Sequence, residues 1–99
     1  MIAVIIKFTV KPDQEKIFID SWKELTKFIY KYHNSLGSRL HKEDDFNFIA
    51  YAQWPDKDTL HNTDSKLPKE ALEARQRMRN ACNKVEKLFE LELIEDLLK

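Results

Sequence analysis

The first segment of the chain alternates between two faces. Residues 2–10 are rich in β-branched side chains, and the even-numbered positions are all apolar, whereas the odd-numbered positions are mixed. A period of two predicts a strand. Because both of its faces are largely apolar, we expect this strand to lie centrally in a sheet that is covered on both sides. The two faces are Ile2, Val4, Ile6, Phe8 and Val10 on one side and Ala3, Ile5, Lys7 and Thr9 on the other.

An amphipathic helix is predicted directly after this strand. The junction Lys11-Pro12-Asp13-Gln14-Glu15 is typical of a helix start, since proline suits the first turn and acidic residues favour the positive end of the helix dipole. Gly37, the one glycine, suits a left-handed cap or tight turn after the helix. Apolar residues recur between these points at steps of three or four: Phe18, Trp22, Leu25, Ile29 and Tyr32, broadened by Ile17 and Phe28.

The middle of the chain predicts a hairpin. Residues 38–43 and 46–54 are strand-like runs on either side of the polar turn Glu43-Asp44-Asp45. In the second run, two alanines lie between bulky aromatics and leave unfilled space on that face. A short helix is expected around 57–62, after Pro55-Asp56. The faces of the second run are Phe46, Phe48, Ala50, Ala52 and Trp54 against Asn47, Ile49, Tyr51 and Gln53.

The last third predicts a second long helix and a closing strand. Pro68 opens a helix that we expect to run through about Asn83, with sparse apolar residues that include Cys82. Residues 85–98 fit either a helix or a strand, and we predict a strand because Phe89, Leu91 and Leu93 alternate with other residues.

The resulting order is β-α-β-β-α-β, an α+β ferredoxin-like antiparallel sheet with helices on one face, in a single domain over residues 1–99. Helices on one face leave the other face of the first strand uncovered. A second copy of the chain would cover it, so we expect a homodimer in which Ala3, Ile5, Lys7 and Thr9 face the partner.

Composition narrows the function classes. The 99 residues allow one small core, and 42% hydrophobic content argues against disorder. Seventeen basic residues balance seventeen acidic ones, so we expect neither nucleic acid nor a membrane surface as a partner. Cys82 is the one cysteine, and no Cys/His cluster has zinc spacing, so no metal site is predicted.

The apolar start of the chain lacks a basic leader and is interrupted by Lys7. We therefore expect no signal peptide, no membrane span and a cytoplasmic location.

Two junctions resemble the antibiotic biosynthesis monooxygenase-like family. They are Lys11-Pro12-Asp13-Gln14-Glu15 and Ala52-Gln53-Trp54-Pro55-Asp56, the latter with Leu60 four residues beyond, and the resemblance covers nearly the whole chain. It implies a dimeric α/β barrel with two sheets back to back and a ligand pocket between the sheet and helices of each subunit. The family includes oxygenases that turn phenolic polyketides into quinones without metal or flavin, haem-degrading enzymes and isomerases.

This resemblance leads to a functional hypothesis: a cofactor-independent monooxygenase acting on a small aromatic or quinol-type compound, with no bound cofactor. The compound would lie over Ala50 and Ala52, flanked by Phe48 and Trp54. Removing a phenolic proton needs an ionisable or hydrogen-bonding group at the pocket, and the catalytic candidates are His61, His41 and Tyr51.

Several of these residues also suit a purely structural role. Trp54 also suits plain core packing, and His41 and Tyr51 suit a dimer seam as well as a pocket rim. Arg39 and Arg75 could anchor an anionic substrate, although surface arginines are common.

Two departures from the family patterns keep another function open. Members often carry a histidine on the short helix; aligned through Leu60, Thr63 holds that place, and His61, two positions earlier, would point about 200° away on a regular helix. The haem-degrading branch uses an Asn, a Trp and a His that are not found at the corresponding positions, so haem degradation is disfavoured. The alternative is a non-catalytic ligand-binding or structural dimer of the same fold.

Overall fold

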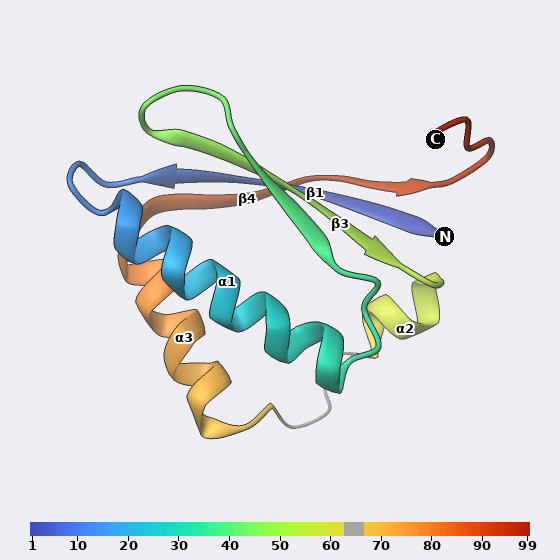
Figure 1. The fold of residues 1–99 in the computed structure, drawn as a ribbon, viewed down its shortest axis with the longest axis horizontal. Helices are drawn as coiled ribbons and strands as arrows, with labels where there is room; N and C mark the ends of the chain where they lie inside the picture. Colours follow the sequence, from blue (N-terminus) through green and yellow to red (C-terminus); the bar gives the residue numbers. More distant parts are fainter. Residues whose placement is uncertain (63–66) are drawn as a thin grey trace.

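The computed structural model describes residues 1–62 and 67–99 and shows a four-stranded antiparallel sheet with helices on one face (Figure 1). The strand order is β2-β3-β1-β4. This confirms the predicted ferredoxin-like α+β fold. In chain order the elements are β1 (Ile2–Val10), α1 (Glu15–Tyr32), β2 (Ser38–Lys42), β3 (Asn47–Trp54), α2 (Lys57–His61), α3 (Lys69–Asn80) and β4 (Cys82–Glu92).

Strand β1 lies centrally, as its two apolar faces predicted. It pairs with β3 on one side and β4 on the other, both antiparallel. Its even-numbered face lies against the helices, where Phe8 is 3% exposed. The ring of the fully buried Phe18, on α1, lies 5.0 Å from Phe8 and 5.2 Å from Phe48 between ring centroids. These three rings anchor α1 on the sheet.

Helix α3 packs beside α1 through small side chains. Ala71 and Ala74 are fully buried, which lets the two helices approach closely. At the surface, Arg77 Nη2 donates to Glu24 Oε2 at 2.6 Å and joins the two helices. In the described part of the chain, all three helices lie on the same side of the sheet, and no element covers the opposite face (Figure 1).

Helix α1 begins later than the sequence predicted. Asp13 has a φ of 64°, in the left-handed region, so the chain cannot be helical there. The Gln14 N–H donates to the Lys11 carbonyl oxygen at 3.2 Å and closes a tight turn, and the helix starts at Glu15. Tyr32, which was counted in the apolar stripe, is 45% exposed at the last residue of the helix.

The boundary between α3 and β4 also differs from the prediction. Helix α3 ends at Asn80, and Cys82 opens β4 opposite Val10 instead of belonging to the helix. The Lys11 N–H donates to the Ala81 carbonyl oxygen at 2.9 Å, so pairing with the end of β1 stops the helix. Strand β4 ends at Glu92 because β1 begins at Ile2, and the Leu93 N–H makes a last bond to the Met1 carbonyl oxygen.

The hairpin of β2 and β3 forms as predicted, with one change at its start. Phe46 precedes β3 and is 49% exposed, so it does not continue the buried row of Phe48 and Ala50. Gly37 has a φ of 99°, which confirms the predicted positive φ, but it lies directly before β2 and does not cap α1, whose last residue is Tyr32.

Candidate functional site

An apolar cavity of about 190 Å³ lies between the sheet and α1. Strands β1 and β3 form its floor, where Ala50 pairs with Ile6 and Ala52 with Val4. Because alanine ends at Cβ, these two positions leave free volume beneath the helix. The lining residues are Val4, Ile6, Phe8, Trp22, Leu25, Thr26, Ile29, Ser35, Ser38, Ala50, Ala52, Trp54, Leu60 and Met78.

The polar groups of this cavity are three hydroxyls and two indoles. Ser38 Oγ donates to the Tyr51 carbonyl oxygen at 2.9 Å, and Ser35 Oγ accepts from the Gly37 N–H at 3.0 Å. Thr26 lies on α1, four residues after Trp22. None of the described lining residues is ionisable. The cavity therefore suits a planar, largely apolar molecule held by a few neutral hydrogen bonds.

The residues predicted to bind a substrate fall into two places. Ala50, Ala52 and Trp54 line the cavity together. Phe48, two residues before Ala50, is buried against Phe18 and lines a different hollow, the α1–β2 groove described below.

His61 lies outside the cavity. It is the last residue of α2, its side chain is 57% exposed, and its Nε2 is 2.8 Å from Glu90 Oε1 on β4. A hydrogen bond from Lys87 lowers the pKa of Glu90, and the contact with His61 lowers it further. His61 thus joins α2 to the edge strand β4. Its neighbour Leu60 lines the cavity.

His41 and Tyr51 also lie outside the cavity. They belong to the sheet face opposite the helices, where His41 is paired with Ile49 and Tyr51 with Arg39. The Tyr51 hydroxyl accepts from Gln53 Nε2 at 3.2 Å. Since β2 is an edge strand, His41 also borders the α1–β2 groove. Thr63, the position aligned with the family histidine, lies outside the described residues.

The α1–β2 groove is a larger and more open hollow of about 630 Å³. It adjoins the cavity, because Trp22 and Ser38 line both. Its apolar residues are Ile19, Trp22, Leu40 and Phe48, and its polar residues are Glu15, Lys23, Ser38, Arg39, His41 and Lys42.

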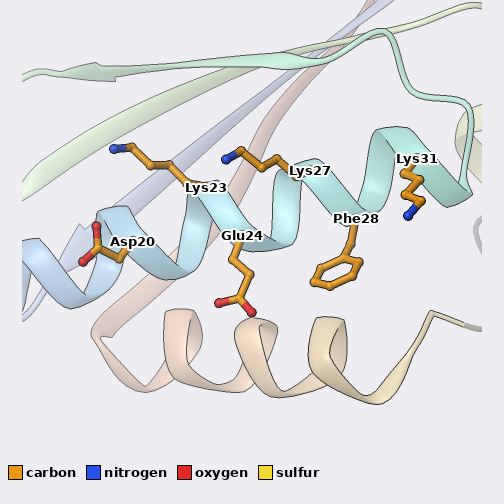
Figure 2. A pocket seen from close by; sticks show the side chains of 6 residues that line it. All are labelled: Asp20, Lys23, Glu24, Lys27, Phe28 and Lys31. Carbon is orange, nitrogen blue, oxygen red and sulfur yellow. The ribbon is translucent and has the colours of Figure 1, made fainter.

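A third hollow, of about 490 Å³, lies on the outer side of α1 (Figure 2). Figure 2 shows Glu24 and Phe28 extending toward α3, while Lys23 and Lys27 extend from the other side of the helix. All described lining residues belong to this one helix. In the described part of the chain, no second element encloses a ligand there, so we regard it as a surface depression.

Several cavity residues were not predicted as site residues. Trp22 was assigned only to the apolar stripe of the helix, and Thr26 and Ser38 were not singled out. The spacing of 22, 26 and 29 places these positions on one helical face, and that face lies over the two alanines. This spacing could have indicated that Trp22 and Thr26 lie near the two alanines, but it does not distinguish a filled core from a cavity.

Residues 1–62 and 67–99 contain neither a candidate metal centre nor a candidate membrane-spanning helix. No group of three or more His, Cys, Asp or Glu side chains in these ranges could hold a metal ion. None of the helices there is both long and apolar enough to cross a membrane.

A β2-β3-β1-β4 antiparallel sheet with an apolar cavity under its helices defines a ferredoxin-like α+β protein. The family model for antibiotic biosynthesis monooxygenases matches residues 1–64, and the chain belongs to that family. A search of curated proteins gave no match.

Solved structures share the fold. SnoaB, a cofactor-independent oxygenase from Streptomyces nogalater, is 15% identical with a TM-score of 0.79, over 99% of this chain and 97% of that one. A structure described as an antibiotic biosynthesis monooxygenase is 16% identical with a TM-score of 0.73, over 96% and 100% of the two chains. Rv0793 from Mycobacterium tuberculosis is 13% identical with a TM-score of 0.74, over 98% of each. At these identities the likeness establishes the fold alone.

Proposed function

We propose that this protein is a cofactor-independent monooxygenase that oxidises a small aromatic or quinol-type compound in the cavity between the sheet and α1. The observation that carries the proposal is the cavity itself, in which Ala50 and Ala52 open a space bordered by Trp22 and Trp54. Membership of the family and the oxygenase activity named for SnoaB support the choice of reaction.

The proposed reaction balances without a cofactor because the substrate supplies the electrons. A hydroquinone and O₂ give a hydroxyquinone and water: the ring loses four electrons, one oxygen atom enters it, and the other leaves as water. Apolar walls suit both the planar ring and dissolved O₂. The chain's part is to hold the ring with the two indoles and to exclude bulk water.

Proton removal from the phenolic group is the step that needs a base. The described cavity lining has no ionisable side chain. Among the three candidates His41, His61 and Tyr51, His41 borders the groove that adjoins the cavity. We therefore rank His41 first as the proton acceptor, and we expect a His41→Ala variant to lose more oxidation rate than His61→Ala or Tyr51→Phe.

Oxygen uptake by the pure protein tests the proposed activity directly. With a panel of phenols and hydroquinones, we expect at least one compound to consume O₂ faster than it does in buffer alone, and the gain should disappear when the protein is heat-denatured. If no compound on the panel reacts faster with the protein, the proposed activity is wrong.

The lack of an ionisable side chain in the described cavity lining favours a second candidate, a non-catalytic ligand-binding protein of the same fold. Ligand binding that changes the fluorescence of Trp22 and Trp54 without accelerating oxygen uptake would identify this function. Binding accompanied by faster uptake would exclude it.

We further propose that the protein acts as a homodimer. The sheet face opposite the helices carries Ile5 and, on β4, Phe89 and Leu91, which are 56% and 48% exposed. Exposed apolar side chains gathered on one sheet face are typical of an interaction site. A second copy of the chain presents the same apolar face and would cover it.

A further inference from the structure

The cavity is small for a complete ligand. Pockets that hold small molecules usually measure roughly 300 to 1,000 Å³, whereas the cavity measures about 190 Å³. A ligand of ordinary size would place only one part of itself there. The rest must leave the cavity along a path that the lining residues define.

The α1–β2 groove provides that path. Trp22 and Ser38 line both hollows, so a ligand whose ring lies over Ala50 and Ala52 can extend past Trp22 into the groove. The inner part of the groove is apolar, with Ile19, Trp22 and Leu40 half-buried. The ligand portion next to the ring would therefore be apolar as well.

The border of the groove is positively charged. Three cationic side chains line it: Lys23, Arg39 and Lys42. Glu15 is the one carboxylate among the described lining residues, so three cations minus one anion give a net charge of +2 when His41 is neutral. Lys42 Nζ is already paired with Glu15 Oε1 at 2.7 Å. Within residues 1–62 and 67–99, no acidic side chain pairs with Lys23 or Arg39. The charges of Lys23 and Arg39 are therefore not neutralised by a carboxylate of the described residues, and both side chains line the groove.

We infer that the ligand is an amphipathic aromatic acid, whose ring occupies the cavity and whose carboxylate lies in the α1–β2 groove near Lys23 and Arg39. This inference rests on the site of the proposed function but not on the reaction. It restricts the substrates to aromatic compounds that carry an anionic group a short apolar distance from the ring.

A matched pair of ligands tests the inference without any turnover. Naphthaleneacetate and naphthaleneacetamide have nearly the same shape and differ in charge. By isothermal titration calorimetry at low salt, we expect the acid to bind about fivefold more tightly than the amide, as expected for a partly exposed ion pair. Added salt should reduce this preference, because it screens the charges.

A double variant identifies the charges that are responsible. Lys23→Gln with Arg39→Gln should abolish the preference for the acid and leave the affinity for the amide unchanged. Because neither residue has an acidic partner in the described chain, the variant leaves no carboxylate unpaired. The matched control, Lys27→Gln with Arg79→Gln, removes one lysine and one arginine that do not line the groove, and it should retain the preference.

The outcomes separate this inference from the proposed reaction. Equal binding of the acid and the amide, binding of neither, or an unchanged preference in the Lys23/Arg39 variant would each overturn the inference. A preference for the acid that depends on Lys23 and Arg39 supports it even if no compound accelerates oxygen uptake. In that case the proposed monooxygenase activity would fail alone.

Discussion

Ala50 and Ala52 are the residues on which the cavity depends. Each occupies a position of β3 that faces the helices, where larger side chains would reach α1. Ala50 is 3% exposed, so its small size is not a consequence of lying at the surface. Together with the half-buried Ala52, Ala50 leaves a space beside Trp22 that the remaining core does not fill.

Filling this space should block ligand binding without unfolding the protein. We expect Ala52→Leu to weaken ligand binding and any oxidation by about tenfold or more, a loss of roughly 1.4 kcal/mol. The free energy of unfolding should stay within about 1.5 kcal/mol of the wild type, because the added atoms enter free volume. Urea unfolding and calorimetric titration measure the two effects.

Ala52→Ser is the matched control, since it adds little volume and should retain binding. If Ala52→Leu binds as tightly as the wild type, the ligand does not use this cavity.

Cys82 is a second residue whose behaviour follows from its surroundings. Burial raises the pKa of its thiol to about 11, although nearby Lys11 acts in the opposite direction. The thiolate is the reactive form, and at pH 8 almost none is present in the folded protein. We expect iodoacetamide to leave Cys82 unmodified at pH 8 in buffer and to alkylate it fully in urea, as measured by mass spectrometry. Rapid alkylation of the folded protein would contradict the buried position of Cys82 at the start of β4.

At the scale of elements, the turn between β2 and β3 depends on Asp44. Its Oδ1 accepts from the backbone N–H groups of Phe46, at 3.0 Å, and Asn47, at 2.9 Å, and the Asn47 side chain donates to both carboxylate oxygens. The side-chain bond from Asn47 and the backbone bond from Phe46 lower the pKa of Asp44 below its ordinary value. The ionised carboxylate therefore holds the hairpin that positions Ala50 and Ala52.

The sign of the pH dependence follows from this lowered pKa. The stabilisation by Asp44 is present above its unfolded pKa of about 4 and is lost as the pH falls through the lower folded value. We expect Asp44→Ala to reduce the thermal midpoint at pH 7, and the difference from the wild type should shrink at pH 2.5.

Asp45→Ala is the control, because no hydrogen bond to that neighbouring carboxylate is found in the described chain, and it should change the midpoint much less. An equal effect of the two variants would show that the loss of charge, and not the turn contacts, is responsible.

At the scale of the whole molecule, the open face of the sheet determines the expected assembly. Light scattering at micromolar concentration should give a mass of about twice the 11.8 kDa of one chain. Phe89→Lys should shift the protein toward the monomer, because a lysine on the apolar face would be buried without a partner charge.

Leu72→Lys is the matched control for Phe89→Lys. Leu72 is 48% exposed on α3, on the helical side of the molecule, and its substitution should leave the mass unchanged. A monomeric wild type with ordinary stability would contradict the proposed dimer.

Local patterns explain why the strands and faces were predictable from the sequence. A period of two in residues 2–10 identifies β1 and its buried face, and the polar turn before β3 identifies the hairpin. Gly37 could be recognised because few other residues adopt a positive φ at low cost. Alanine positions within a strand of aromatics indicated where a cavity would lie, and Ala50, Ala52 and Trp54 do line it.

Other features depended on contacts between segments far apart in the chain. Helix α3 gives way to β4 at Cys82 because Val10 and Lys11 offer strand pairing there. The residues around Cys82 carry no local signal of this pairing, because the partners lie about 70 residues earlier in the chain. His61 pairs with Glu90, 29 residues away, instead of lining the cavity. Trp22 and Ser38 join the cavity to the groove only because α1 crosses the hairpin at that point. The sequence alone thus determined the order of the four strands, the two faces of β1 and the gap that Ala50 and Ala52 leave in β3, since these follow from side-chain periodicity and side-chain size. The tertiary structure decided which polar and charged groups surround that gap, since these come from packing between distant segments.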